Sequence, residues 1–176
     1  MKENSAIGHL NVAIHLDKIV LGKNSEIVRN NWITGYPTNT TSKHFEHQIN
    51  RKSELHIGNN SSITKSHHID CTNTITIGSF ATIAGYKSQF LTHSIDVQEN
   101  RQSSSPITIG DYTFVSTNVV VLGGSCLPNN SILGAKGLLN KCYQDNWYLY
   151  GGVPAQPIKK IDPNAKYFSR TSGFVY

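Results

Sequence analysis

The sequence has few of the residues from which surface helices and membrane spans are built. Charged residues make up 15% of its 176 positions and hydrophobic residues 38%. Exposed helices need more Glu, Lys, Ala and Leu than this, so the composition favours short strands and turns. The longest aliphatic run, "VVVL" at 119–122, is much too short to cross a bilayer. We therefore expect no stable membrane insertion.

Cysteine is also scarce, and its three copies show no paired spacing. An odd count at Cys71, Cys126 and Cys142 favours free thiols in a reducing compartment. The amino-terminal stretch "MKENSAIGHL" lacks the apolar segment of a signal peptide. Together these features predict a soluble, cytoplasmic protein.

Basic residues outnumber acidic ones, but they are not clustered. The formal charge is +5 and the pI about 9.1, yet no run of Lys and Arg exceeds two residues. The aromatic residues do not alternate with basic ones either. A balance of this size suits an anionic ligand, whereas the pattern argues against nucleic-acid binding.

The strongest signal is a rhythm of six residues. From position 109 the chain divides into the blocks "IGDYTF", "VSTNVV", "VLGGSC", "LPNNSI" and "LGAKGL". Six residues advance a helical wheel by roughly 600°, so this period cannot keep one face of an α-helix apolar. Short strands separated by turns explain it, with three strands forming one triangular coil. Each block opens with an aliphatic residue expected inside: Ile109, Val115, Val121, Leu127 and Leu133.

Coil starts carry a second mark, an aliphatic-x-aliphatic-Gly pattern at 19–22, 55–58, 75–78 and 107–110. An uninterrupted coil needs 18 residues, so the longer intervals before the second and fourth marks require insertions. We place these insertions at 36–53 and 96–106. Both precede a coil-opening strand, and we therefore expect them to leave from the same corner. The alternative to a coiled fold is that the six-residue spacing arises by chance in an ordinary β-sandwich.

In these blocks the sequence resembles the hexapeptide-repeat acyltransferases. The segment "LYGGVPAQPIKKI" at 149–161 resembles the stretch with which those enzymes leave their helix, and the likeness runs from Ile7 to Ile161. It is closest to the maltose and galactoside acetyltransferases, which have a His, a polar loop with an Arg, and a Pro before "ITIG". Here these are His93, Arg101 and Pro106.

This resemblance implies an all-β fold, a left-handed parallel β-helix, over residues 1–161, followed by a tail at 162–176. It also implies a homotrimer with active sites between subunits, acetyl-CoA as cosubstrate without a metal, and a saccharide acceptor, for example a surface-polysaccharide component or precursor. The chain departs from these relatives in two ways. It begins repeating almost at once, where they have a helical segment, and they lack the insertion at 36–53.

His93 is the candidate general base. It falls sixteen residues after Ile77, at the end of a third strand, where the chain departs into the second insertion. An imidazole titrates near neutrality and suits removal of a proton from an attacking hydroxyl. Asn73 has the same offset in the preceding coil, and we expect it beside His93. It would serve either in acceptor binding or in a stacked asparagine ladder.

Three further residues are candidates for acceptor binding. Arg101 matches the loop Arg of the relatives, and Asp96 lies on the same loop. Both would alternatively contact another subunit or keep the loop soluble. His67 and its neighbour His68 lie on a second strand, from which one of them must point outward. A solvated turn is the competing interpretation.

The resemblance also suggests a binding surface for coenzyme A. Two small residues would line the pantetheine slot, an aromatic residue precedes the repeat, and two lysines match positions whose cations meet phosphates. These residues are Phe114, Thr117, Ala135, Lys141 and Lys159.

Other functions remain open. An amino sugar could accept the acetyl group on nitrogen. A zinc hydratase would need three converging histidines, drawn from His67, His68 and His93. A β-helix without catalytic activity is a further alternative. Cys71 and Cys126 have no basic partner at a suggestive spacing, so we expect inert thiols rather than nucleophiles.

Overall fold

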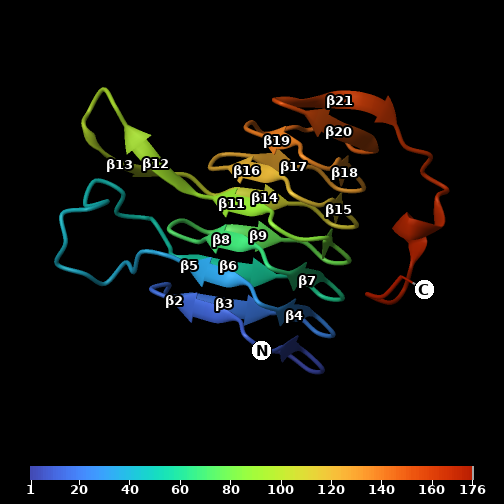
Figure 1. Cartoon of the computed structure of the whole chain (residues 1–176), viewed down its shortest axis with the longest axis horizontal. Helices are drawn as coiled ribbons and strands as arrows, with labels where there is room; N and C mark the ends of the chain where they lie inside the picture. The colour runs from blue at the N-terminus through green and yellow to red at the C-terminus, as the bar shows by residue number, and fades with distance from the viewer. Residues whose placement is uncertain (176) are drawn as a thin grey trace.

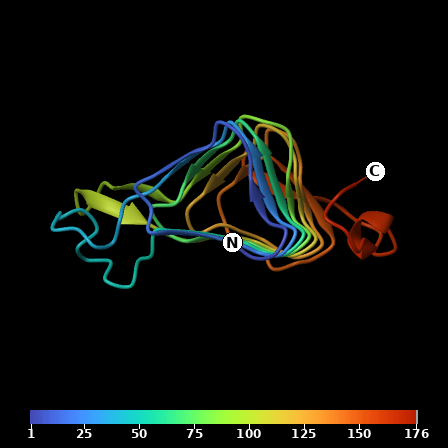
Figure 2. The same cartoon turned by 90° about the horizontal axis from the view of Figure 1, so that it is seen from below.

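The structure, a computed structural model that describes residues 1–175, is a triangular prism of stacked coils with two long excursions (Figures 1 and 2). Three sheets form its walls. Within each wall, strands from successive coils pair in parallel, apart from the final antiparallel pair β20–β21. Each strand is short because the chain must turn a corner after a few residues.

The first wall is an eight-stranded sheet. Its strands are, in spatial order, β1 (Ala6–Ile7), β4 (Glu26–Arg29), β7 (Ser62–Lys65), β10 (Thr82–Ile83), β15 (Phe114–Val115), β18 (Ile132–Leu133), β20 (Tyr148–Gly152) and β21 (Ala155–Lys160).

The second wall has six strands and the third has five. The second contains β2 (Val12–Ile14), β5 (Trp32–Thr34), β8 (His68–Asp70), β11 (Gln89–Leu91), β16 (Val120–Leu122) and β19 (Leu138–Leu139). The third contains β3 (Lys18–Leu21), β6 (Glu54–Ile57), β9 (Ile75–Ile77), β14 (Ile107–Ile109) and β17 (Cys126–Leu127).

The aliphatic positions of the six-residue rhythm form the core, as the sequence predicts. Their side chains point into the prism, where they stack on the equivalent residues of the coils above and below. Burial of these columns removes apolar surface from water, which is the main force that holds a coil closed. The exposed fraction is 1% or less at all five: Ile109, Val115, Val121, Leu127 and Leu133.

Both insertions leave the prism at one edge, the insertion corner, where the six-stranded wall passes to the five-stranded wall. Residues 36–53 connect β5 to β6, and a hairpin lies between β11 and β14 (Figure 2). Leu21 pairs with Ile57, so one coil plus a loop separates them, as expected. The second insertion is more regular than a loop, because β12 (His93–Asp96) and β13 (Arg101–Ser104) pair as antiparallel strands.

The carboxy-terminal tail packs along a different edge, the tail corner, where the five-stranded wall passes to the eight-stranded wall. Figure 1 shows it descending from β21 toward the first coils. It contains one short 3₁₀ helix, η1 (Lys166–Ser169). Arg170 lies over the ring of Tyr167 at 4.0 Å and reaches the stacked rings of Phe80 and Tyr112, whose centroids are 4.5 Å apart.

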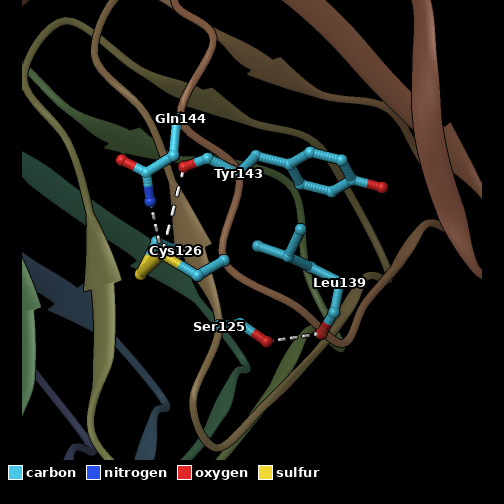
Figure 3. Close-up of a disulfide and its surroundings, with 6 residues drawn as sticks. Ser125, Cys126, Leu139, Tyr143 and Gln144 are labelled. Atoms are coloured by element: carbon cyan, nitrogen blue, oxygen red, sulfur yellow. Dashed lines mark hydrogen bonds between the residues drawn. A yellow bond between two sulfur atoms is a disulfide. The ribbon is translucent and has the colours of Figure 1, made fainter.

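The expectation of three free thiols is wrong. A disulfide joins Cys126 and Cys142, and Cys71 alone remains a free thiol (Figure 3). Cys126 begins one coil and Cys142 occupies the equivalent place in the next, so the bridge links neighbouring coils at the insertion corner. The spacing of 16 residues does not indicate the bridge, because the coil between the two cysteines is irregular and shorter than the regular 18. Cys71 is buried, and burial raises the pKa of its thiol, which is consistent with an inert side chain.

Candidate active site

His93 and Asp70 form a hydrogen-bonded pair at the insertion corner. His93 Nδ1 lies 2.7 Å from Asp70 Oδ2. The side chain of Asp70 is 5% exposed, whereas that of His93 is 46% exposed. An ionised carboxylate can only accept hydrogen bonds, so Nδ1 must carry the hydrogen. The neutral ring therefore presents its Nε2 lone pair to a partner outside the protein.

Several donors hold the Asp70 carboxylate in place. Oδ1 accepts hydrogen bonds from Thr72 N at 3.1 Å and from Thr72 Oγ1 at 2.6 Å. Oδ2 accepts from the backbone N–H groups of Thr92 at 3.0 Å and His93 at 3.2 Å. Burial alone would raise the pKa of Asp70, but the hydrogen bonds from His93 and Thr72 outweigh it and lower the pKa to about 2. The carboxylate is thus charged at neutral pH.

The same pair changes the basicity of His93. The hydrogen bond to Asp70 raises the pKa of His93 above its usual 6.5, against the smaller, opposing effect of burial. A more basic imidazole accepts a proton more readily once it is neutral. Asp70 therefore performs two functions, since it selects the tautomer and strengthens the base.

Strand register brings the two residues together. In the six-stranded wall Leu91 of β11 pairs with Asp70 of β8, an offset of 21 residues. His93 comes two residues later, where β12 begins and the chain turns outward. Gly123, in the turn of the next coil, packs against this point. A β-carbon there would lie 2.7 Å from the Thr92 carbonyl oxygen, so only glycine permits the approach.

His93 is one of the residues that line a pocket of about 320 Å³ at the base of the hairpin. His93 and Ser94 line one side of it, Ser103 and Ser105 the other, and Gly123 its end. This pocket is open to solvent and lies next to the exposed imidazole. His93 therefore lies at an exposed edge beside a cleft, where the sequence places it.

The first insertion folds against the same histidine. Phe45, which is 6% exposed, meets the His93 ring edge-on with 6.3 Å between centroids. Arg51 holds this loop together, because its guanidinium donates to the carbonyl oxygens of Tyr36 and Thr72 and lies 4.6 Å from the Phe45 ring centroid. Thr72 in turn holds Asp70, so the loop and the His93–Asp70 pair share one hydrogen-bond network.

Asn73 lies close to the hairpin but not in the position expected. Its side-chain N–H donates to Ser104 Oγ at 3.1 Å, and its backbone N–H donates to Thr92 Oγ1 at 2.9 Å. Ser104 is the residue that pairs with His93 across the hairpin. The expected stacking assumed a 20-residue offset between coils, whereas the strands pair at 21. Asn73 thus supports the base of the hairpin.

Asp96 and Arg101, the two acceptor-binding candidates on the hairpin, lie opposite each other near the hairpin tip. Arg101 pairs with Asp96 across the ladder, and its exposed side chain lines a second pocket beside the first insertion. The Asp96 carboxylate accepts hydrogen bonds from the backbone N–H groups of Gln98 and Glu99, both at 3.2 Å. Asp96 therefore shapes the turn, and Arg101 is the one that faces open space.

His67 does not reach any groove, which corrects the expectation that it contacts the acceptor. Its side chain is buried, with the residue 2% exposed, and Nδ1 accepts a hydrogen bond from Ser88 N at 3.2 Å. Burial lowers the pKa of His67 to about 4. The residue that points outward is His68, which is exposed on β8. Sequence pattern could show that one of the pair faces out, but not which one.

The residues assigned to coenzyme A do not gather in one place on a single chain. Thr117 and Ala135 lie at the corner between the eight- and six-stranded walls, and Phe114 lies on β15 just before it. Lys141 lies at the insertion corner after β19, and Lys159 lies on β21. No pocket described for residues 1–175 is lined by two of these five.

Two general findings concern metals and membranes. Among residues 1–175, no three or more His, Cys, Asp or Glu side chains are placed to hold a metal ion. In the same residues no helix has the length and apolarity needed to span a bilayer. His67 is enclosed while His93 is bonded to Asp70, so the three histidines considered for zinc do not converge.

Comparisons with known proteins agree with this architecture. No family model matches the sequence. Galactoside O-acetyltransferase of Escherichia coli (strain K12) is 30% identical over 120 residues, which are 66% of this chain and 59% of that protein. The chain therefore spans about three-fifths of the length of this curated relative.

Two solved structures share the fold. One is a hexapeptide-repeat acetyltransferase from Vibrio cholerae O1 biovar eltor, complexed with acetyl coenzyme A. Its TM-score is 0.55 and its sequence identity 21%, and the match covers 91% of this chain and 72% of that protein. The other is a maltose O-acetyltransferase from Clostridium difficile 630, with a TM-score of 0.60 and 19% identity. This match covers 81% of this chain and 70% of that protein. The resemblance seen in the sequence is thus confirmed: this chain has the left-handed parallel β-helix of the hexapeptide-repeat acetyltransferases and is similar in sequence to galactoside O-acetyltransferase.

Proposed function

We propose that the chain transfers an acetyl group from acetyl-CoA to a hydroxyl of a saccharide, with His93 as general base. The observation that carries this proposal is the pair of His93 and Asp70, which leaves a free Nε2 beside an open pocket. The names of the similar proteins, which act on galactosides and maltose, support the acceptor class.

The chemistry needs one proton acceptor and a held pair of substrates. His93 Nε2 takes the proton of the acceptor hydroxyl while the oxygen attacks the thioester carbonyl carbon. The tetrahedral intermediate then collapses, the carbon–sulfur bond breaks, and the imidazolium returns its proton to the departing thiolate. Asp70 stabilises the imidazolium between these two steps. Binding both substrates in one groove supplies much of the remaining acceleration.

The distribution of the coenzyme A candidates supports a groove between subunits. Thr117 and Ala135 lie on one corner of the prism, whereas His93 and Lys141 lie on another. In such a groove, one copy of the chain presents the corner that carries Thr117 and Ala135, and its neighbour presents the insertion corner that carries His93 and Lys141. Three flat walls and closed cyclic symmetry favour a trimer for such packing.

The test is a thiol-release assay with acetyl-CoA against a panel of neutral, acidic and amino sugars. We expect turnover with a hydroxyl acceptor, and a loss of at least roughly a hundredfold in His93→Ala, the scale of a lost general base. The matched control is His68→Ala, because His68 is an exposed histidine on the neighbouring coil. Equal turnover in wild type and His93→Ala would remove His93 from the mechanism, and turnover with amino sugars alone would assign N-acetylation.

A further inference from the structure

The two insertions meet beside His93 and enclose a second pocket. Gln48 and Ser104 connect them through two hydrogen bonds, from Gln48 Nε2 to Ser104 O at 2.9 Å and from Ser104 Oγ to Gln48 Oε1 at 2.6 Å. The pocket between them measures about 320 Å³. Phe45 forms part of its wall and also contacts the His93 ring. A ligand held here would therefore be separated from the His93 ring by Phe45.

Cationic and imidazole side chains line this pocket. Lys43, His44 and His47 come from the first insertion and Arg101 from the hairpin. No carboxylate is among its lining residues. The positive charges therefore come from two segments that are far apart in sequence, and the fold brings them to one place.

Lys43 and Arg101 have no ionic partner among residues 1–175. The ion pairs formed among residues 1–175 include neither Lys43 nor Arg101, and neither side chain makes a hydrogen bond to another described residue. Two acids lie on the same hairpin, Asp96 and Glu99. Asp96 accepts hydrogen bonds from the backbone N–H groups of its own turn, and Glu99 forms no ion pair among residues 1–175. Two unpaired cations at one pocket favour an anionic ligand, and guanidinium groups match carboxylate and phosphate geometry.

The remaining wall suits the body of a sugar. Ile95 is 62% exposed and lines the pocket. It lies two residues after His93 on β12, so both side chains lie on the same face of the hairpin. The amide of Gln102, opposite Ile95, supplies hydrogen-bonding groups for hydroxyls. The apolar surface next to the cations continues toward the base.

We propose that this pocket binds a carboxylate or phosphate carried by the acceptor, so that the enzyme selects acidic saccharides. This inference rests on the proposed acetyl transfer and names its acceptor class. The anionic group anchors in the pocket, and a hydroxyl of the adjoining residue reaches His93. Lys43 and Arg101 thereby determine specificity without touching the reacting atoms.

The experiment compares three acceptors that share a galactosyl residue and differ in the group carried by the second sugar: lactose, which is neutral, the same disaccharide with glucuronate in place of glucose, and lactose 1-phosphate. The readout is the ratio of kcat/KM for each anionic acceptor to that for lactose. We expect wild type to favour at least one anionic form by roughly tenfold or more, the scale of a charge-assisted hydrogen bond. The two arms distinguish carboxylate from phosphate recognition. Added salt should reduce the preference.

The variant is Lys43→Gln with Arg101→Gln, and its matched control is Lys65→Gln with Arg29→Gln, an exposed lysine and arginine that pair on the eight-stranded wall. The first should bring the ratio close to one, and the second should retain it. A wild-type ratio near one, or a ratio that survives in the first variant, would overturn the proposal. So would a comparable loss of affinity for free coenzyme A, since that would assign the cations to the cosubstrate.

Direct binding separates this inference from the proposed function. Ligand-observed NMR with the three disaccharides, without acetyl-CoA, measures acceptor binding independently of acetyl transfer. Preferential binding of an anionic form that disappears in the Lys43 and Arg101 variant would support the pocket even if no sugar were acetylated. Turnover of sugars without any preference for charge would support acetyl transfer and contradict the pocket.

Discussion

Asp70 Oδ2 and His93 Nδ1 lie 2.7 Å apart, with the carboxylate inside the protein and the imidazole at its surface. This arrangement differs from a surface ion pair, because the carboxylate also accepts five hydrogen bonds from Thr72, Thr92 and the His93 backbone at its two oxygens. The ring cannot rotate without breaking its bond to a fixed acceptor. Its outer nitrogen is therefore aimed before any substrate arrives.

Asp70→Asn should weaken catalysis and shift its pH dependence. In the wild type His93 must be neutral to act, and its raised pKa places the acidic limb of kcat/KM above pH 6.5. Removing the carboxylate charge lowers the pKa of His93, so the limb should move to lower pH. An amide can also hold the wrong tautomer, and we expect kcat to fall at least roughly tenfold.

The measurement is a pH–rate profile with saturating acetyl-CoA. Asp145→Asn, at an exposed carboxylate away from the corner, is the matched control and should keep the wild-type profile. A profile that stays in place in Asp70→Asn would mean that Asp70 does not set the basicity of His93.

His67 should make the protein less stable in mild acid. Its pKa is about 4 in the folded state and 6.5 ordinarily, because burial disfavours the charged ring. Between these values the unfolded chain binds a proton that the folded chain does not. The free energy of unfolding should therefore fall as pH drops from about 6.5 to about 4, by up to about 3 kcal/mol.

Urea unfolding at a series of pH values tests this contribution. His67→Gln should flatten the dependence over that window, whatever its effect on overall stability. His68→Gln removes the adjacent exposed histidine and should retain the slope. Identical slopes in the wild type and His67→Gln would show that another group titrates.

Arg51→Met should loosen the first insertion without disrupting the coils. Arg51 donates to the carbonyl oxygens of Tyr36, Pro37 and Thr72, and these would lose their charged donor. We expect faster trypsin cleavage after Lys43, together with a higher KM for the acceptor. The prism is held by its own aliphatic columns, so its melting temperature should stay close to that of the wild type.

Arg29→Met is the control for Arg51, because Arg29 is exposed on β4 and its side chain makes no hydrogen bond among residues 1–175. Its cleavage rate after Lys43 should match the wild type. If Arg51→Met were equally resistant, the guanidinium would not be what orders the insertion.

Reduction of the Cys126–Cys142 bridge should destabilise the last coils. The bridge closes a chain segment with a sequence separation of 16, and loop-entropy arguments assign about 3 kcal/mol to closure of that size. Unfolding with and without dithiothreitol measures the difference. Cys142→Ser should lose the dependence on reductant. Alkylation of the denatured, unreduced protein should modify one thiol, Cys71, and modification of three would contradict the bridge.

Much of the fold could be predicted because the six-residue period is a local property. Aliphatic residues at Ile109 and each sixth position after it can share an interior only if the chain coils, and the structure has that coil. His93 was found for the same reason, since it stands where the period breaks. The placement of both insertions at one corner also followed from counting residues.

The Asp70 partner could not be found by counting alone. Coils here differ in length, because Ile83 pairs with Ile63 at an offset of 20 whereas Phe90 pairs with Ile69 at 21. That extra residue at one corner shifts which side chain lies beside His93. The sequence does show an acidic residue at the end of the strand "HHID". Only the strand register identifies it as the partner of His93.

The tail has a consequence for how the prism unfolds. In a stack of repeats each coil contacts only its neighbours, so the ends can fray while the middle stays folded. Here Tyr167 bonds to the Thr113 carbonyl, Arg170 spans Phe80 and Tyr112, and Gly173 closes against the backbone of Asn60. One strap thus crosses three successive coils. It ties these three coils together, so they should unfold in a single cooperative step.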